Sequence, residues 1–155
     1  MKKLLLLGGS AQQVVAIGRA KTMGYYTVLC DYLPDNPGQH HAHKFYQVST
    51  TDKEAVLKIA AEEKIDGIIA YASDPAAPTA AYVAEKLHLP TNPYESVEIL
   101  CNKDKFRRFL RENGFNAPTA RGYESPEAAL ADLESFRLPA MKIATGLVKS
   151  FLKRR

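Results

Sequence analysis

Short, unbroken apolar runs alternate with amphipathic stretches over roughly the first hundred residues, and this alternation limits the possible folds more than any other feature. Strands are expected at four of these runs, residues 3–7, 26–30, 45–48 and 65–70. Apolar runs of this kind are typical of parallel strands that helices cover on both faces. The pattern therefore predicts an α/β fold, a Rossmann-like parallel sheet with helices on both faces.

Three helices are expected in the same region. The first should end at Gly24 and face the sheet with the stripe Ala11, Val14, Val15 and Gly18. The second begins with Thr51 and Glu54 in the spacing of a capping box. The positions expected to face inward in the second and third helices are Val56, Ile59, Ala60, Ala80, Val83, Ala84 and Leu87.

The composition changes near residue 100, which we take as the end of a first domain, residues 1–100. Residues 101–145 are expected to form a linker helix and the first β-α-β of a second, α+β subdomain. The linker helix lies in "NKDKFRRFLRENG" and should bury Phe106, Phe109 and Leu110.

A further helix is predicted from Ser125, Pro126 and Glu127, which supply an N-cap, a first-turn proline and an acid that suits the helix dipole. A strand should follow at 138–144. Residues 146–155 are interpreted as a truncated or non-native basic tail.

The distribution of charge excludes a nucleic-acid partner. All 17 acidic residues and 17 of the 21 basic residues lie before Lys149, so residues 1–148 are formally neutral. A nucleic-acid binder needs a basic face on its folded body. The four leucines after Lys3 are too few for a signal peptide or a membrane span, and the two cysteines lie far apart. We therefore expect a cytoplasmic protein with no membrane partner and no cysteine-based metal site.

A glycine-rich turn, Gly8, Gly9 and Ser10, lies between the first strand and the first helix, where backbone N–H groups attract anions. As a dinucleotide fingerprint it is poor, because Ser10 and Gln13 take the second and third glycine positions. Asp31 ends the second strand, where an acid contacts ribose in dinucleotide-binding folds. A tight turn without any ligand is an equally weighted alternative.

Two more groups of residues are candidates for a binding site, one at the same edge of the sheet and one in a loop. Ser73 and Asp74 follow the fourth strand, and ligands of open α/β sheets bind along that edge. A helix cap is an alternative role for Asp74. The loop histidines His40, His41 and His43 are a weak metal signal, so no metal site is predicted and solvated side chains are the preferred interpretation.

These motifs, in this order, resemble the ATP-grasp superfamily of carboxylate–amine ligases. The resemblance rests on "LLLLGGS", "CDYLPDNPG", "YASDP" and "NKDKFRRFLRENGF", and it extends to Met141. Proteins like the large subunit of carbamoyl-phosphate synthase are the nearest in pattern, and the ATP-dependent phosphoribosylglycinamide formyltransferases are more distant. The resemblance implies that residues 1–100 are the pre-ATP-grasp domain.

The resemblance implies ATP contacts for Lys103, at the start of the linker helix, and for Lys142, in the expected strand. Around Lys142 the match is imperfect, because one residue is missing before it and Ile143 replaces the proline of the family pattern. A plain solvated face is the alternative for Lys103. The family's pre-ATP-grasp domain contributes to the substrate site, which implies substrate contacts at Gly8, Gly9, Ser10, Asp31, Ser73 and Asp74.

The function implied is that of an N-terminal fragment of an ATP-dependent ligase. The intact enzyme would use ATP and Mg²⁺, act on a small carboxylate or amine, and work as a homo-oligomer or with a second chain. The Ser/Gly-rich phosphate loop and the Mg²⁺ carboxylates of the family pattern do not appear, so this chain alone is expected to be inactive, without catalytic residues or a tightly bound cofactor. The alternative is a stand-alone Rossmann-like module that binds a nucleotide or nucleotide sugar.

Overall fold

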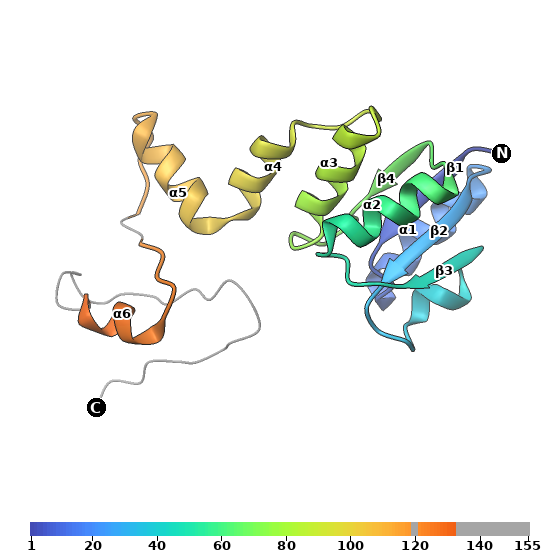
Figure 1. Ribbon diagram of the computed structural model, residues 1–155, viewed down its shortest axis with the longest axis horizontal. Helices are drawn as coiled ribbons and strands as arrows, with labels where there is room; N and C mark the ends of the chain where they lie inside the picture. The colour runs from blue at the N-terminus through green and yellow to red at the C-terminus, as the bar shows by residue number, and fades with distance from the viewer. Residues whose placement is uncertain (119–120, 133–155) are drawn as a thin grey trace. The chain divides into compact units, whose positions relative to one another are not determined.

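The computed structural model describes residues 1–118 and 121–132. The chain divides into two units, of which the first is Met1–Cys101 and the second begins at Asn102. The first unit contains one parallel sheet with the strand order β3-β2-β1-β4 (Figure 1). Its strands are β1 (Lys3–Leu7), β2 (Tyr26–Asp31), β3 (Lys44–Gln47) and β4 (Gly67–Ile69). This confirms the expected α/β class. Strand β3 is shifted by one residue from its expected position, and strand β4 is shorter than expected.

Helices lie between and after the strands, as the alternation predicts. They are α1 (Ala11–Thr22), the short 3-10 helix η1 (Pro37–His40), α2 (Lys53–Glu63), α3 (Ala77–Lys86) and α4 (Tyr94–Cys101). Within the described residues, no helix is long and apolar enough to cross a membrane.

Two apolar layers cover the sheet because successive strand residues point to opposite faces. Leu5 and Leu7 of β1 belong to one cluster, together with Val56 of α2 and Val83 of α3. Leu6 belongs to a second cluster with Ile17 of α1 and Leu29 of β2. The unbroken run of leucines in β1 is thus explained, because both of its faces are buried.

The predicted inward stripe of α1 is wrong in its phase. Gln13, Ile17 and Ala20 are the buried residues of this helix, whereas Val15 is 68% exposed. Apolar periodicity places Gln13 outside because its side chain is polar. In the structure the Gln13 amide is buried and hydrogen-bonded. The buried face of α1 therefore includes Gln13 and is rotated relative to the predicted face. Gly24 follows the helix with a φ of +83°, as expected for a residue that ends a helix.

The other two predicted helices bury most of the expected residues, but Ala80 and Leu87 are only half-buried against the core, and one cap is corrected. Val56, Ile59 and Ala60 are buried in α2, and Val83 and Ala84 are buried in α3. The N-cap of α2 is Asp52 rather than Thr51. Its carboxylate accepts a hydrogen bond from the N–H of Ala55 at 3.1 Å.

The second unit contains α5 (Lys103–Glu112) and α6 (Pro126–Ala131) in its described part. Ser125 caps α6 by accepting a hydrogen bond from the N–H of Ala128 at 3.2 Å, as its sequence position predicts. The expected burial of Phe106, Phe109 and Leu110 in α5 is wrong. None of the residues of α5 is buried, and Phe109 is 41% exposed.

Candidate functional site

A pocket of about 370 Å³ opens at the carboxyl edge of the sheet in the first unit. It is bounded by the segments that follow β1, β2, β3 and β4, where ligands of open α/β sheets bind. Of the residues predicted to bind a substrate, Gly8, Ser10, Asp31 and Ser73 line this pocket. The structure also brings Ala11, Gln13, Tyr32, Leu33, Asn36, Pro37 and Thr50 to its wall.

The turn after β1 is built from glycine because the space around it is filled. Gly8 has a φ of +104°, in the region that side-chain-bearing residues avoid. A Cβ on Gly9 would lie 2.1 Å from Oδ1 of Asn36. The carbonyl oxygen of Gly9 accepts a hydrogen bond from the N–H of Gly38 at 2.7 Å. The turn therefore packs directly against the loop that follows β2.

Asp31 holds this turn in place. It is 7% exposed, its Oδ2 accepts a hydrogen bond from the N–H of Gly9 at 2.7 Å, and its Oδ1 accepts one from the N–H of Leu33 at 2.8 Å. Both carboxylate oxygens therefore fix backbone beside the pocket. Charge-assisted bonds of this kind are stronger than those between neutral groups. Asp31 shapes the pocket whether or not it also contacts a ligand.

The side chain of Asn36 joins two parts of the loop after β2 by hydrogen bonds. Its Nδ2 donates to the carbonyl of Leu33 at 2.9 Å, and its Oδ1 accepts from the N–H of Gln39 at 2.9 Å. The side chain is 2% exposed. This buried amide stabilises the loop that forms one wall of the pocket.

The polar groups that line the pocket are mostly neutral, and apolar surface makes up the larger part of its lining. Ser10, Thr50 and Ser73 supply hydroxyls, each able to donate or accept a hydrogen bond. The wall also includes the start of α1, where the first N–H groups of a helix lack intrahelical partners and favour negative charge. None of the described lining residues is a lysine, arginine or histidine. This arrangement suits a small polar ligand held by hydroxyl and backbone groups.

Asp74 differs from Ser73 in its placement. It is exposed, it is not among the residues that line the pocket, and it does not cap α3, whose N-cap residue is Ala76. Its carboxylate lies near Cys101 at the end of α4. Burial, and secondarily this charge, raise the pKa of the Cys101 thiol. The alternative role of Asp74 as a helix cap is therefore wrong, and its substrate contact stays a prediction.

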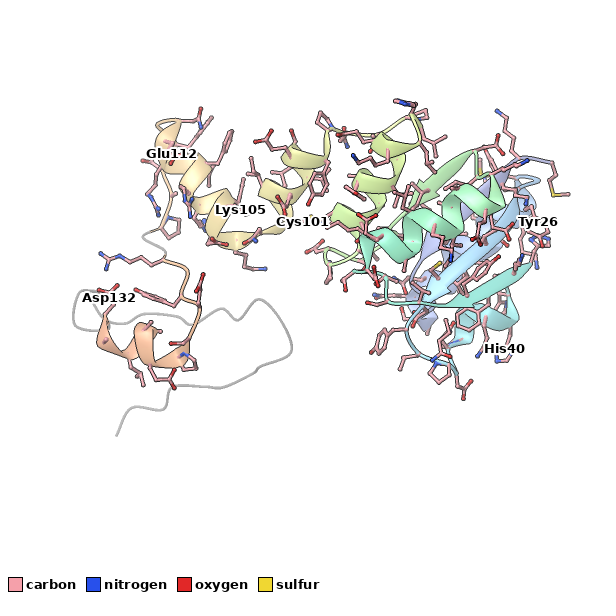
Figure 2. The ribbon with its side chains drawn as sticks, viewed as in Figure 1. Tyr26, His40, Cys101, Lys105, Glu112 and Asp132 are labelled. Atoms are coloured by element: carbon pink, nitrogen blue, oxygen red, sulfur yellow. The ribbon has the colours of Figure 1, made fainter. Side chains whose placement is uncertain are left out.

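The histidines of the loop before β3 do not form a metal site. Nδ1 of His43 accepts a hydrogen bond from the N–H of Thr27 at 3.0 Å, and the His43 ring stacks on Tyr26 with 4.7 Å between ring centroids. His40 is exposed on η1 (Figure 2). Over residues 1–118 and 121–132 there is no group of three or more His, Cys, Asp and Glu side chains placed to hold a metal ion.

The ATP contacts expected of two lysines stay predictions. Lys103 is the first residue of α5 and is exposed, so its side chain is accessible to a nucleotide. Lys142 lies outside the described residues, as do the expected strand at 138–144 and the tail. In the part of the chain that the structure describes, no cluster of carboxylates fits Mg²⁺.

Sequence reasoning missed Gln13, Asn36 and Thr50 as site residues. Asn36 carried a usable signal, because an asparagine directly before a proline is typical of a residue that begins a helical turn. Thr50 lies just after the third strand, so its position at the edge was also predictable. Ser10 and Gln13 have the spacing of a capping box, so the bond between them was predictable, whereas the contact of Gln13 with Tyr71, 58 residues further along the chain, was not.

The chain has relatives among enzymes of known activity, although no family model matches it. The formate-dependent phosphoribosylglycinamide formyltransferase of Sulfurisphaera tokodaii is 30% identical over 133 residues, which cover 81% of this chain and 32% of that protein. The chain thus spans about a third of the length of the curated relatives that it matches.

Two solved structures have a similar fold. Phosphoribosylglycinamide synthetase from Anaerococcus prevotii matches with a TM-score of 0.70 at 20% identity, covering 89% of this chain and 35% of that one. The L-amino acid ligase from Bacillus licheniformis matches with a TM-score of 0.68 at 27% identity, covering 90% of this chain and 36% of that one.

The finer likeness to carbamoyl-phosphate synthase stays a prediction. Relatives by sequence and relatives by fold agree on the broader family, since the formyltransferase, the synthetase and the amino acid ligase are all ATP-grasp ligases. Over most of its length the chain is therefore similar to the N-terminal portion of ATP-grasp ligases.

Proposed function

We propose that this chain supplies the N-terminal, substrate-binding part of an ATP-dependent carboxylate–amine ligase. The observation that carries the proposal is the pocket at the carboxyl edge of the sheet, which gathers Gly8, Ser10 and Ser73 from two separate loops. Its hydroxyls and the start of α1 suit a carboxylate or an amine-bearing small molecule. The intact enzyme would form an acyl phosphate from the carboxylate, and the amine would then displace the phosphate.

ATP and Mg²⁺ belong to the intact enzyme in this proposal. When bound, they supply the phosphoryl group and neutralise its charge during transfer. Lys103 is the described residue proposed to contact ATP, and Lys142 is the second candidate. The rest of the nucleotide site would come from the part of the relatives that this chain does not span, on the same polypeptide, on a second chain or in a homo-oligomer. The proposed location is the cytoplasm.

The relatives suggest which ligands to test. One is named for phosphoribosylglycinamide and formate, and another acts on L-amino acids. We expect the full 155-residue chain to bind at least one of phosphoribosylglycinamide, formate and L-alanine in isothermal titration calorimetry. Ser10→Ala and Ser73→Ala should each weaken binding by about 0.5–1.5 kcal/mol, the usual net contribution of one hydrogen bond.

A matched control is Ser96→Ala, because Ser96 is exposed on α4 and does not line the pocket. Its affinity for the same ligand should equal that of the unmodified chain. Equal affinities in all three variants would place the ligand elsewhere and refute the proposal. Preference for AMP or a nucleotide sugar over the three named ligands would instead support a stand-alone nucleotide-binding module.

A further inference from the structure

We propose that Gln13 is a positioning residue that couples the two loops carrying Ser10 and Ser73 and so sets the width of the pocket. The inference rests on the proposed function, because it concerns the same pocket. Gln13 lines the pocket and is 7% exposed, although it is a polar residue in the first turn of a helix. Burial of an amide is costly unless both its donor and its acceptor have partners.

The two ends of the Gln13 amide bind different loops. Oε1 accepts a hydrogen bond from the N–H of Ser10 at 2.9 Å, in the turn after β1. Nε2 donates a hydrogen bond to the carbonyl of Tyr71 at 3.1 Å, in the loop after β4. This single side chain therefore spans the edge of the sheet between two loops that are distant in the sequence.

The orientation of this amide is fixed by its partners. Turning it over would bring an NH₂ group against the N–H of Ser10 and an oxygen against the carbonyl of Tyr71. Gly8 leaves the room that the side chain needs, since a Cβ there would lie 2.3 Å from Nε2 of Gln13. The glycine and the glutamine are thus complementary parts of one arrangement.

The loop after β4 needs such an anchor. Ala72 has a φ of +52°, a left-handed conformation that a residue with a side chain adopts at a cost in free energy. It lies between Tyr71, which Gln13 holds, and Ser73, which lines the pocket. The bond to Tyr71 stabilises the strained conformation and with it the position of Ser73. The carbonyl of Ser73 also accepts backbone hydrogen bonds from Ala76 and Ala77 at 3.2 and 3.1 Å.

Gln13→Glu distinguishes the two hydrogen bonds, because it keeps one and removes the other. The introduced carboxylate still accepts from the N–H of Ser10, but it places an oxygen against the carbonyl of Tyr71, where the amide had donated. Gln13→Leu removes both bonds while keeping a side chain of similar size. Gln12→Glu is the matched control, since Gln12 is exposed on the same helix and does not line the pocket.

The coupling is tested by amide hydrogen exchange, measured by NMR on the full ¹⁵N-labelled chain. In Gln13→Glu, the amides of Ala76 and Ala77 should exchange roughly three- to tenfold faster, as loss of one hydrogen bond predicts. The amide of Ser10 should keep its protection. In Gln13→Leu all three amides should exchange faster, and in Gln12→Glu none should change. Unchanged exchange at Ala76 and Ala77 in both Gln13 variants would overturn the inference.

Lowering the pH provides a rescue that a general loss of packing would not show. Near pH 3.5, roughly the ordinary range for a carboxyl group, the introduced carboxyl of Gln13→Glu is mostly protonated and can again donate to Tyr71. Exchange at Ala76 and Ala77, relative to the unmodified chain at the same pH, should return toward equality. That comparison removes the effects of pH that both chains share, including those at Asp31, the charged residue that lines the same pocket. A ratio that does not change with pH would contradict the proposed bond.

The effect on binding distinguishes this inference from the proposed function. If the unmodified chain binds phosphoribosylglycinamide, formate or L-alanine, Gln13→Glu should weaken that affinity roughly three- to tenfold at neutral pH. An unchanged affinity despite faster exchange would show a merely structural residue and overturn the positioning role. If none of the three ligands binds, the proposed function fails, while the exchange measurements alone decide whether Gln13 couples the loops.

Discussion

At the scale of single residues, the pocket edge depends on a few positions where no other type of residue could make the same contacts. Gly9 is the clearest, because Asn36 occupies the space next to its Cα and Asp31 accepts a hydrogen bond from its N–H. Gly18, in the middle of α1, serves no such purpose, because a Cβ added there would have no neighbouring atom within 4 Å. We therefore expect opposite changes in the free energy of unfolding when each of the two glycines is replaced by alanine.

Gly9→Ala should lower the free energy of unfolding by about 1–3 kcal/mol, the range for forcing extra volume into a packed site. Gly18→Ala should raise it by about 0.5–1 kcal/mol, because alanine favours the helical conformation more than glycine does. Urea titrations followed by circular dichroism measure both changes. Equal effects of the two substitutions would contradict the packing described for Gly9.

A second residue-scale feature is Glu63, at the opposite edge of the sheet from the pocket. Its carboxylate accepts hydrogen bonds from Lys3 at 2.8 Å, from Lys44 at 2.5 Å and from the hydroxyl of Tyr46 at 2.6 Å. The bonds from Lys3, Lys44 and Tyr46 lower the pKa of Glu63 to about 2 from 4.5. The charged carboxylate is thus strongly favoured in the folded chain.

This lowered pKa predicts how stability depends on pH. A group whose pKa is depressed by folding stabilises the fold fully above its unfolded pKa, and that contribution is lost as the pH falls. For Glu63 the loss runs from about pH 4.5 down to about pH 2. Glu63→Gln should cost about 1–2 kcal/mol of unfolding free energy at neutral pH. The difference from the unmodified chain should shrink as the pH falls through that range, and a constant difference in urea titrations would contradict the assignment.

At the scale of elements, apolar patterns predicted the sheet well and the face of α1 poorly. Strand β1 is apolar on both faces because helices cover both, so its position was evident from "LLLL" alone. The face of α1 depends on Gln13, whose burial follows from hydrogen bonds to Ser10 and Tyr71. Contacts between loops distant in the sequence leave no local periodic signal. Asp31 and Ser73 were predictable as residues of the pocket edge because each follows a strand. The spacing of Ser10 and Gln13 indicated their capping bond, but not the contact of Gln13 with Tyr71.

The corrected face of α1 gives an element-scale prediction. Ile17 is fully buried between α1 and the sheet, so Ile17→Ala should cost about 2–4 kcal/mol of unfolding free energy. Val15→Ala, two residues earlier on the same helix, should change it by less than about 0.5 kcal/mol, because Val15 is 68% exposed. Thermal or urea unfolding compares the two. A larger loss of unfolding free energy in Val15→Ala than in Ile17→Ala would instead support the inward stripe predicted from the sequence.

At the scale of the whole molecule, a parallel-sheet domain with its own pocket corresponds to the N-terminal portion of larger enzymes. The order of motifs along the sequence indicated the ATP-grasp ligases, and the relatives and the parallel sheet agree with that family. The expected contacts of Lys142 fall outside the described residues, and Lys103 lies in a separate unit from the pocket. The central claim for the chain itself is therefore that the pocket in Met1–Cys101 binds a substrate of the ligase.

The most direct test of that claim is to map ligand contacts on the ¹⁵N-labelled full chain by amide chemical-shift changes. Phosphoribosylglycinamide, formate and L-alanine would be titrated separately. For the ligand that binds, the largest shifts should fall on Ser10, Ala11, Leu33, Thr50 and Ser73, all of which line the pocket. Amides at the opposite edge, such as those of Lys3 and Lys44, should not move. Saturable shifts centred on that opposite edge, or no shifts with any of the three ligands, would contradict the claim.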